Sequence, residues 1–281
     1  RAGKVLQTLG EPALYSQPSF SPDSSRVAVA VGRSGTISAG LRVINVETGA
    51  VTQIAESKMP LESARSPVWS PDGQYLAYVA TRNSSAGIYR AQADGQGAEE
   101  LLYKLSVPIT VLTDWSLEGK VLYYYTPQLG ESTLYALPLE GDRTPVARLR
   151  SQFADPRVSP DGTLVAYRSN ETGRNEIWVS MLDSANPNAA PRRWQISGQG
   201  GLGMARWRRD GRVLYYFAAD RGIMAVPVTA SPEPQFGKPV LMFKAPRAID
   251  IGPNAQLGAS GAMSLDGERL IFALPPEPEL Q

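Results

Sequence analysis

The sequence predicts an all-β fold of six similar units, and three observations support this. A short motif recurs six times: a bulky residue, a polar residue, and a turn centred on an acidic residue. The stretch after each turn is rich in β-forming residues. The content of 26 Gly and 23 Pro in 281 residues suits short strands joined by tight turns. Successive acidic residues lie 49, 46, 43, 49 and 56 positions apart, at Asp23, Asp72, Glu118, Asp161, Asp210 and Asp266.

Each motif predicts a β-hairpin. An Asp in the turn accepts a hydrogen bond from the backbone two residues later, and a following Gly adopts the left-handed conformation that closes the turn. We therefore assign the six acidic residues a structural turn role. The first strands are predicted at residues 17–21, 66–70, 109–116, 155–159, 204–208 and 259–264.

The strand after each turn is apolar on both faces. Side chains four and six positions after the acidic residue share one face, since strand side chains alternate with a period of two. The residue between them, as in Ala28, Ala77 and Ala166, is also apolar in most repeats. A strand of this kind must be covered on both sides. Most repeats also contain sequence patterns for two further strands. Four strands in a repeat of this length predict a propeller blade.

The predicted architecture is a six-bladed β-propeller forming a single domain over residues 1–281. The last repeat lacks its outer strands, and a strand pattern at residues 4–9 precedes the first repeat. We expect this N-terminal strand to close an incomplete last blade, because an open propeller would expose two sheet edges. The predicted blades cover about 16–55, 66–105, 109–149, 155–197, 204–244, and 258–274 plus 4–9.

Composition excludes several kinds of site. The chain has no His and no Cys, which removes Ser-His-Asp triads, thiolate nucleophiles, disulfides and zinc sites with His or Cys ligands. No apolar run is long enough to span a bilayer. We expect no catalytic residue, no resident metal or other cofactor, and no membrane insertion by this chain.

Nucleic-acid binding is also not expected. Arginines cluster at residues 206–209, but the net charge is +1 and a broad basic surface is not predicted. The Gly-rich stretch at 198–203 is followed by a predicted strand. The helix N-terminus that holds a dinucleotide's pyrophosphate is therefore not expected after it.

The residues Phe20-Ser-Pro-Asp, Trp69-Ser-Pro-Asp-Gly and Val158-Ser-Pro-Asp-Gly resemble the WD40-like PD40 repeat of TolB-type six-bladed propellers. Three segments show a narrower resemblance: 10–23, 169–179, and 194–197 together with 206–211. They look like the C-terminal propellers of bacterial transmembrane serine/threonine kinases. Signatures of the kinase domain itself, such as His-Arg-Asp and Asp-Phe-Gly, do not occur in this chain.

The resemblance implies a non-catalytic sensor or interaction domain that binds a protein, peptide or envelope ligand on one propeller face. Its implied location is periplasmic or extracytoplasmic, with tethering by an upstream transmembrane segment in the kinase form. One alternative is a free TolB-like periplasmic scaffold. A second is a Ca²⁺-dependent hydrolase of the six-bladed type, because oxygen ligands remain available for calcium.

The candidate ligand site is a polar ring at the mouth of the predicted channel. Asp114, Arg157 and Arg206 each precede the bulky residue of their repeat, so alternation directs them away from the core. Asp155 lies nearby in sequence. Such a ring suits a carboxylate, a phosphate or a peptide terminus. The alternative is that these charges pair with one another and line a hydrated channel.

Overall fold

The structure is a computed structural model of the chain. It describes residues 7–11, 13–33, 36–56, 62–107, 109–182, 192–229, 233–245 and 261–273. Every regular element within these ranges is a β-strand, and none is a helix. The described residues divide into two compact units. Unit 1 contains those of 109–246 and 265–267, and unit 2 contains those of 5–108, 247–264 and 268–281.

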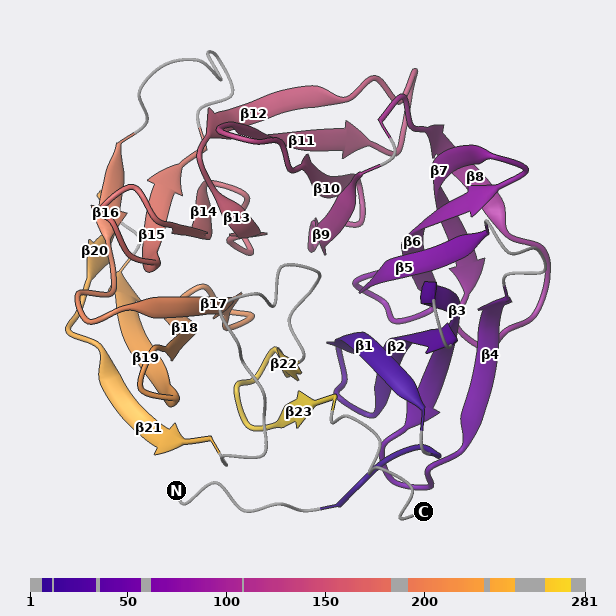
Figure 1. Cartoon of the computed structure of the whole chain (residues 1–281), viewed down its shortest axis with the longest axis horizontal. Helices are drawn as coiled ribbons and strands as arrows, with labels where there is room; N and C mark the ends of the chain where they lie inside the picture. Colours follow the sequence, from indigo (N-terminus) through magenta and orange to yellow (C-terminus); the bar gives the residue numbers. More distant parts are fainter. Residues whose placement is uncertain are drawn as a thin grey trace. The chain divides into compact units, whose positions relative to one another are not determined.

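Unit 2 contains two four-stranded antiparallel sheets and one two-stranded sheet, all connected as simple meanders (Figure 1). Blade 1 consists of β1 (Leu14–Phe20), β2 (Arg26–Arg33), β3 (Thr36–Asn45) and β4 (Val51–Glu56). Blade 2 consists of β5 (Ser63–Trp69), β6 (Tyr75–Arg82), β7 (Ser85–Gln92) and β8 (Glu100–Lys104). The short sheet pairs β22 (Gly261–Met263) with β23 (Leu270–Phe272).

Unit 1 contains three antiparallel sheets of the same kind. Blade 3 consists of β9 (Val111–Trp115), β10 (Val121–Thr126), β11 (Ser132–Pro138) and β12 (Val146–Ser151). Blade 4 consists of β13 (Ala154–Val158), β14 (Leu164–Ser169), β15 (Glu176–Met181) and β16 (Arg193–Gln195). Blade 5 consists of β17 (Gly201–Trp207), β18 (Val213–Ala218), β19 (Gly222–Thr229), β20 (Gln235–Phe236) and β21 (Val240–Lys244), with β20 and β21 both paired to β19.

The second strand of a blade is apolar on both faces because each face packs into a different core. In β14, Val165 and Tyr167 belong to a cluster with side chains of β10 and β11. The intervening Leu164 and Ala166 belong to another cluster with side chains of β17 and β18. All four are at most 5% exposed. Burial of each large side chain contributes about 1.5–3 kcal/mol, so this arrangement stabilises unit 1 strongly.

The described part of the N-terminal segment shows no strand within the range predicted at residues 4–9. Residues 4–6 lie outside the described residues, and 7–9 are not in a strand. Instead, the Gln7 side-chain amide donates to the carbonyl of Val46. Leu9 and Ile271 both pack against Val27, Val29 and Ile44. Leu9 thus adds an apolar side chain to the unit 2 core without joining a backbone ladder.

The larger sheets follow the predicted repeats, but the last one is smaller than predicted. Five sheets of four or five strands span 14–56, 63–104, 111–151, 154–195 and 201–244. Within the range predicted for blade 6, the described residues form the two-stranded β22–β23 sheet and no third strand. The single domain predicted over residues 1–281 stays a prediction, and the described residues divide into the two compact units given above.

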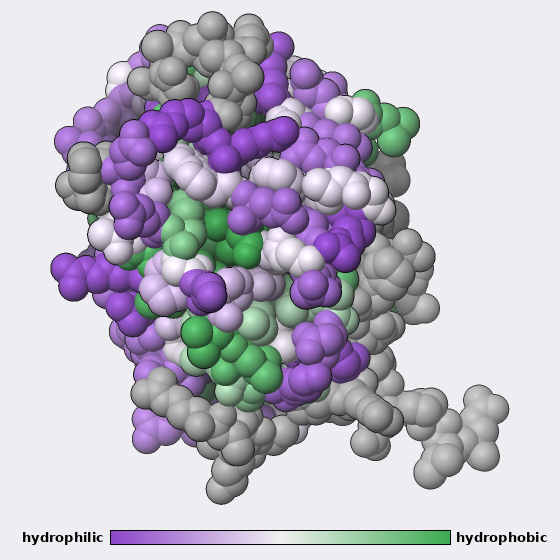
Figure 2. All heavy atoms as spheres, turned by 90° about the vertical axis from the view of Figure 1, so that its left-hand side faces the viewer, coloured by the Kyte–Doolittle hydropathy of each residue, from purple (hydrophilic) through white to green (hydrophobic). Residues whose placement is uncertain are grey.

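Apolar side chains also reach the surface of unit 1. Figure 2 shows apolar area among hydrophilic residues on the side of the molecule that carries β16, β20 and β21. Val240 and Leu241 on β21 are 58% and 49% exposed. Beneath this surface, Trp194 and Phe236 contact each other with ring centroids 5.5 Å apart. This ring contact joins β16 of blade 4 to β20 of blade 5.

Candidate functional site

The turns between the first and second strands of blades 1, 2 and 4 share one hydrogen-bond pattern. In blade 4, Ser159 Oγ accepts the N–H of Leu164 at 2.9 Å and donates to Asp161 Oδ1 at 2.6 Å. Asp161 Oδ1 also accepts the N–H of Thr163 at 3.1 Å. Burial opposes ionisation, but these hydrogen bonds hold the pKa of Asp161 below its usual value. The same bonds recur at residues 21–26 and 70–75, so the side chains around these turns are held at fixed positions.

The first strands carry a β-bulge that the sequence did not reveal. The pairing register shifts within each of β1, β5, β9, β13 and β17. In four of these strands a non-glycine residue has a positive φ of 52–54°, three positions before the bulky residue of the motif. These residues are Gln17, Ser66, Asp155 and Met204. Because non-glycine residues rarely adopt this conformation, the bulge is imposed by the sheet and not by local preference.

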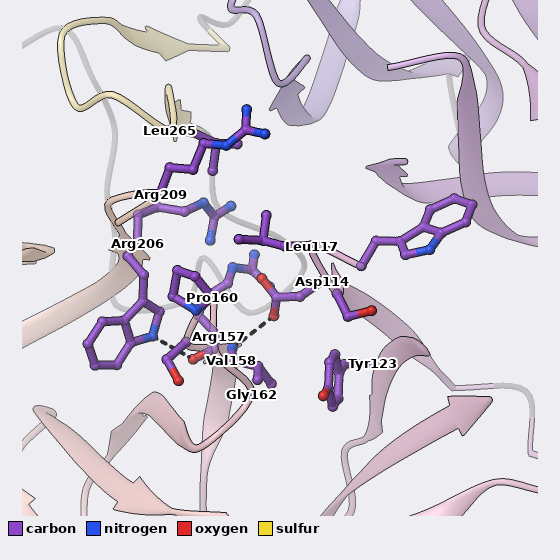
Figure 3. Close-up of a pocket in the computed structure, with 14 residues that line it drawn as sticks. Asp114, Leu117, Tyr123, Arg157, Val158, Pro160, Gly162, Arg206, Arg209 and Leu265 are labelled. Carbon is purple, nitrogen blue, oxygen red and sulfur yellow. Dashed lines mark hydrogen bonds between the residues drawn. The ribbon is translucent and has the colours of Figure 1, made fainter. Parts of the chain in front are cut away.

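A pocket of about 90 Å³ lies within unit 1, at the turns of blades 3, 4 and 5 (Figure 3). Two positions of the repeat supply most of its functional side chains. The residue four before the acidic one contributes Asp114, Arg157 and Arg206. The residue directly before the acidic one contributes Leu117, Pro160, Arg209 and Leu265.

Hydrogen bonds between blades hold the pocket together. The Trp207 indole N–H donates to the carbonyl of Arg157 at 2.9 Å, and the Val158 N–H donates to Asp114 Oδ2 at 3.0 Å (Figure 3). In unit 2, Trp69 donates in the same way to the carbonyl of Ser19 at 2.9 Å. Tryptophans of two repeats are thus both core side chains and donors to the preceding blade.

Asp114 is a half-buried carboxylate beside Arg157. Burial raises its pKa, although the charge of Arg157 and hydrogen bonds from Val158 and Thr113 act in the opposite direction. No ion pair joins Asp114 to an arginine in the described part of the chain. The carboxylate is therefore oriented by a backbone N–H and not by direct pairing with a guanidinium.

The arginines of the pocket retain many unbonded donors. Arg157 Nη1 donates to the carbonyls of Thr113 at 3.5 Å and Pro156 at 3.1 Å, while its buried Nε has no partner. Arg206 Nη1 donates to the carbonyl of Ala205 at 3.0 Å. Each guanidinium has five N–H donors, so most of them remain available to an anion.

The structure brings together three of the four residues proposed for the ligand site. Asp114, Arg157 and Arg206 line the pocket, but Asp155 does not. Simple alternation places Asp155 and Arg157 on the same face. The bulge centred on Asp155 breaks this alternation, and its carboxylate instead pairs with Arg168 at 3.2 Å and lies against Gly203. Asp155 therefore lies outside the lining of this pocket.

Sequence reasoning missed Leu117, Arg209 and Leu265. Their common position in the repeat could have identified them, because all three directly precede the acidic turn residue. Their equivalents in the first two repeats are Pro22 and Pro71. The residue before the acidic one is proline in repeats 1, 2 and 4. It is leucine in repeats 3 and 6 and arginine in repeat 5.

Among the described residues, no group of three or more His, Cys, Asp or Glu side chains is arranged to hold a metal ion. No helix long and apolar enough to cross a membrane occurs in the described ranges. The pocket remains the candidate site, and it offers arginine donors beside an apolar lining.

Comparison with known proteins relates the chain to TolB. No family model matches it. The chain is 24% identical over 187 residues to the Tol-Pal system protein TolB of Francisella tularensis subsp. mediasiatica (strain FSC147). This match covers 66% of the chain and 42% of the relative, so the chain spans less than half the length of the curated relatives it matches.

Solved structures show the fold. A structure described as TolB from Agrobacterium tumefaciens matches with a TM-score of 0.59 and 16% identity, over 82% of this chain and 83% of that one. The β-propeller domain of Cps50 (Swd1) from Myceliophteria thermophila matches with a TM-score of 0.56 and 15% identity, over 94% and 80%. The chain therefore has a TolB-like β-propeller fold. Because propellers carry many functions, this likeness does not define an activity.

Proposed function

We propose that this chain is a non-catalytic, six-bladed propeller that binds a protein partner through the pocket of unit 1. The observation that carries this proposal is the pocket itself, in which arginines with unbonded donors surround an apolar space of about 90 Å³. Typical small-molecule sites enclose roughly 300–1,000 Å³. A space this small suits one anchoring group of a larger partner better than a whole metabolite.

The chemistry of the lining favours binding over catalysis. Two serines line the pocket, but both hydroxyls accept backbone N–H groups: Ser116 from Val121 at 3.1 Å and Ser159 from Leu164 at 2.9 Å. The chain contains no His that could activate a serine, and no Cys. Asp114 is oriented by the backbone of Val158 and is not hydrogen-bonded to either serine in the described structure.

The proposed setting is outside the cytoplasm, where the domain acts as a sensor or scaffold. The TolB similarity supports a protein-interaction role, and the segment at 169–179 supports the narrower role of C-terminal sensor domain of a bacterial membrane serine/threonine kinase. The part of the gene upstream of Arg1 would distinguish a kinase sensor domain from a free scaffold protein. A kinase domain and an apolar span would select the sensor, whereas a signal peptide alone would select a free TolB-like scaffold.

Site-specific photo-crosslinking in cells of the source organism tests the binding role. A benzoylphenylalanine replaces Leu117 at the pocket, which is 41% exposed, or Leu129 as a control. Leu129 belongs to the same unit, is fully exposed and does not line the pocket. We expect a defined protein adduct from position 117 and not from position 129. Equal labelling at both positions, or no adduct at position 117, would refute the proposal.

A further inference from the structure

The pocket of unit 1 concentrates positive charge in a small space. Arg157, Arg206 and Arg209 line the pocket together with the single carboxylate of Asp114, and the Arg157 guanidinium lies beside that carboxylate (Figure 3). The pocket therefore carries two more positive than negative charges when Asp114 is ionised. Such an excess within a partly desolvated space favours an anionic ligand group.

The backbone positions these cations independently of any ligand. The Arg209 N–H donates to the carbonyl of Leu265 at 2.9 Å, which fixes the turn of blade 5 against Leu265. The carbonyl of Arg157 is held by the Trp207 indole at 2.9 Å. These bonds fix the backbone from which the Arg157 and Arg209 side chains extend, and the side-chain torsions are then ordered when a ligand binds.

The volume of the pocket limits the size of the anchoring group. The 90 Å³ is several times the roughly 10–15 Å³ that one water needs and well below the roughly 300–1,000 Å³ of typical small-molecule sites. This is enough for a carboxylate with one or two attached carbons. It is too small for a sugar or a nucleotide.

The remaining lining favours a carboxylate over a phosphate. The excess of two positive charges attracts a dianion at least as strongly as a monoanion, so the preference for a carboxylate comes from the apolar part of the lining. The leucines at positions 117 and 265 and Pro160 lie beside the arginines and offer apolar contact next to the charge. The last residue of a protein combines these features, since its α-carboxylate is directly attached to the carbon that bears its side chain.

We propose that this pocket binds the C-terminal carboxylate of a partner protein, through Arg157, Arg206 and Arg209. The side chain of the partner's last residue then contacts Leu117 and Leu265. This inference rests on the proposed function, which supplies the partner. It adds the chemical group that the pocket recognises.

The test uses small probes on the intact chain, so it needs no identified partner. N-acetyl-leucine presents a terminal carboxylate beside an apolar side chain, and N-acetyl-leucinamide is its uncharged counterpart. The α-amide of N-acetyl-aspartic acid, which has a free side-chain carboxylate, and inorganic phosphate represent the competing anions. Binding is followed by NMR shifts of the Val158, Gly162 and Arg209 backbone amides. For a probe of this size we expect a Kd in the millimolar range for N-acetyl-leucine and at least tenfold weaker binding of the other three.

Charge-removing variants locate the binding. Arg206→Gln and Arg209→Gln each remove one cation, and Arg212→Gln is the matched control because Arg212 lies in the same hairpin but does not line the pocket. We expect each pocket variant to weaken N-acetyl-leucine binding about tenfold or more, as for loss of a charge-assisted hydrogen bond. The control should change it less than twofold. Thermal midpoints equal to that of the parent chain would show that the variants are folded.

Several results would overturn the inference. One is binding of N-acetyl-leucinamide as tight as that of N-acetyl-leucine. Another is binding of phosphate or of the aspartate derivative that is tighter than that of N-acetyl-leucine. The third is N-acetyl-leucine binding by both pocket variants that equals that of the parent chain. The proposed function fails separately. Normal N-acetyl-leucine binding without a cross-linked partner counts against the protein-binding role alone, whereas a cross-linked partner without N-acetyl-leucine binding counts against the carboxylate inference alone.

Discussion

Replacement of Glu176 by Gln should destabilise unit 1 far more than its position at a strand end suggests. Glu176 is completely buried. Its carboxylate accepts hydrogen bonds from Arg174 Nε at 2.5 Å, from the Ser197 hydroxyl, and from the Gly200 N–H at 3.1 and 3.2 Å to its two oxygens. These bonds join the start of β15 to the Gly-rich segment that leads into β17.

The size of the effect follows from these contacts. A glutamine oxygen in the Oε2 position still accepts from Ser197 and Gly200, but the amide then faces the N–H groups of Arg174 and Gly200 with its own N–H donors. One buried donor then lacks an acceptor, which costs about 1–3 kcal/mol. The lost ion pair with Arg174 adds at most about 1 kcal/mol, because that side chain is 56% exposed. We expect the free energy of unfolding to fall by about 2–3 kcal/mol.

Urea denaturation measures this change, with Glu171→Gln as the control. Glu171 lies in the same β14–β15 connection and pairs with Arg193 at 2.6 Å, but both of these side chains are partly exposed. Its replacement should cost less than about 1 kcal/mol. Hydrogen exchange should also become faster at the Gly200 amide in the Glu176 variant. Equal losses of stability in the two variants would refute the reasoning from burial.

Three further predictions concern the repeats. Ser66→Gly should raise the free energy of unfolding by about 1 kcal/mol, because Ser66 has a φ of 54° and a buried hydroxyl without a partner; a lower thermal midpoint would contradict this. Trp207→Phe should cost about 1–2 kcal/mol by leaving the Arg157 carbonyl without its 2.9 Å donor. Trp115→Phe, which removes a bond within one turn, should cost less, and the reverse order in urea midpoints would count against inter-blade bonding. Burial opposes ionisation of Asp23, but hydrogen bonds from Ser21 and Ser25 and the charge of Arg26 lower its pKa from 3.8 to about 2. Its contribution to stability is therefore complete above about pH 4 and is lost as the pH falls through about 2. Asp23→Asn should flatten the pH dependence of stability between pH 4 and 2, and an unchanged slope would contradict this.

The repeat and its hairpins could be predicted because their causes are local. The bonds from Ser159 and Asp161 close a turn within five residues, so the residue types at these positions are sufficient to recognise it. The residues of β14 are apolar on both faces, and this pattern correctly predicted that the strand is covered by a separate core on each side. Three residues of the pocket followed from the same alternation.

The sequence alone thus determined the repeating unit, the direction of most side chains and the propeller class. Tertiary structure decided where alternation fails. The bulge at Asp155 carries no distinctive residue type, and it turns that carboxylate toward Arg168 and away from the pocket. Tertiary structure also decided that Leu265, far from Arg209 in sequence, accepts a hydrogen bond from its backbone. Both features depend on pairing and packing between segments that are far apart in the sequence. The free energy of these contacts cannot be inferred from a short motif.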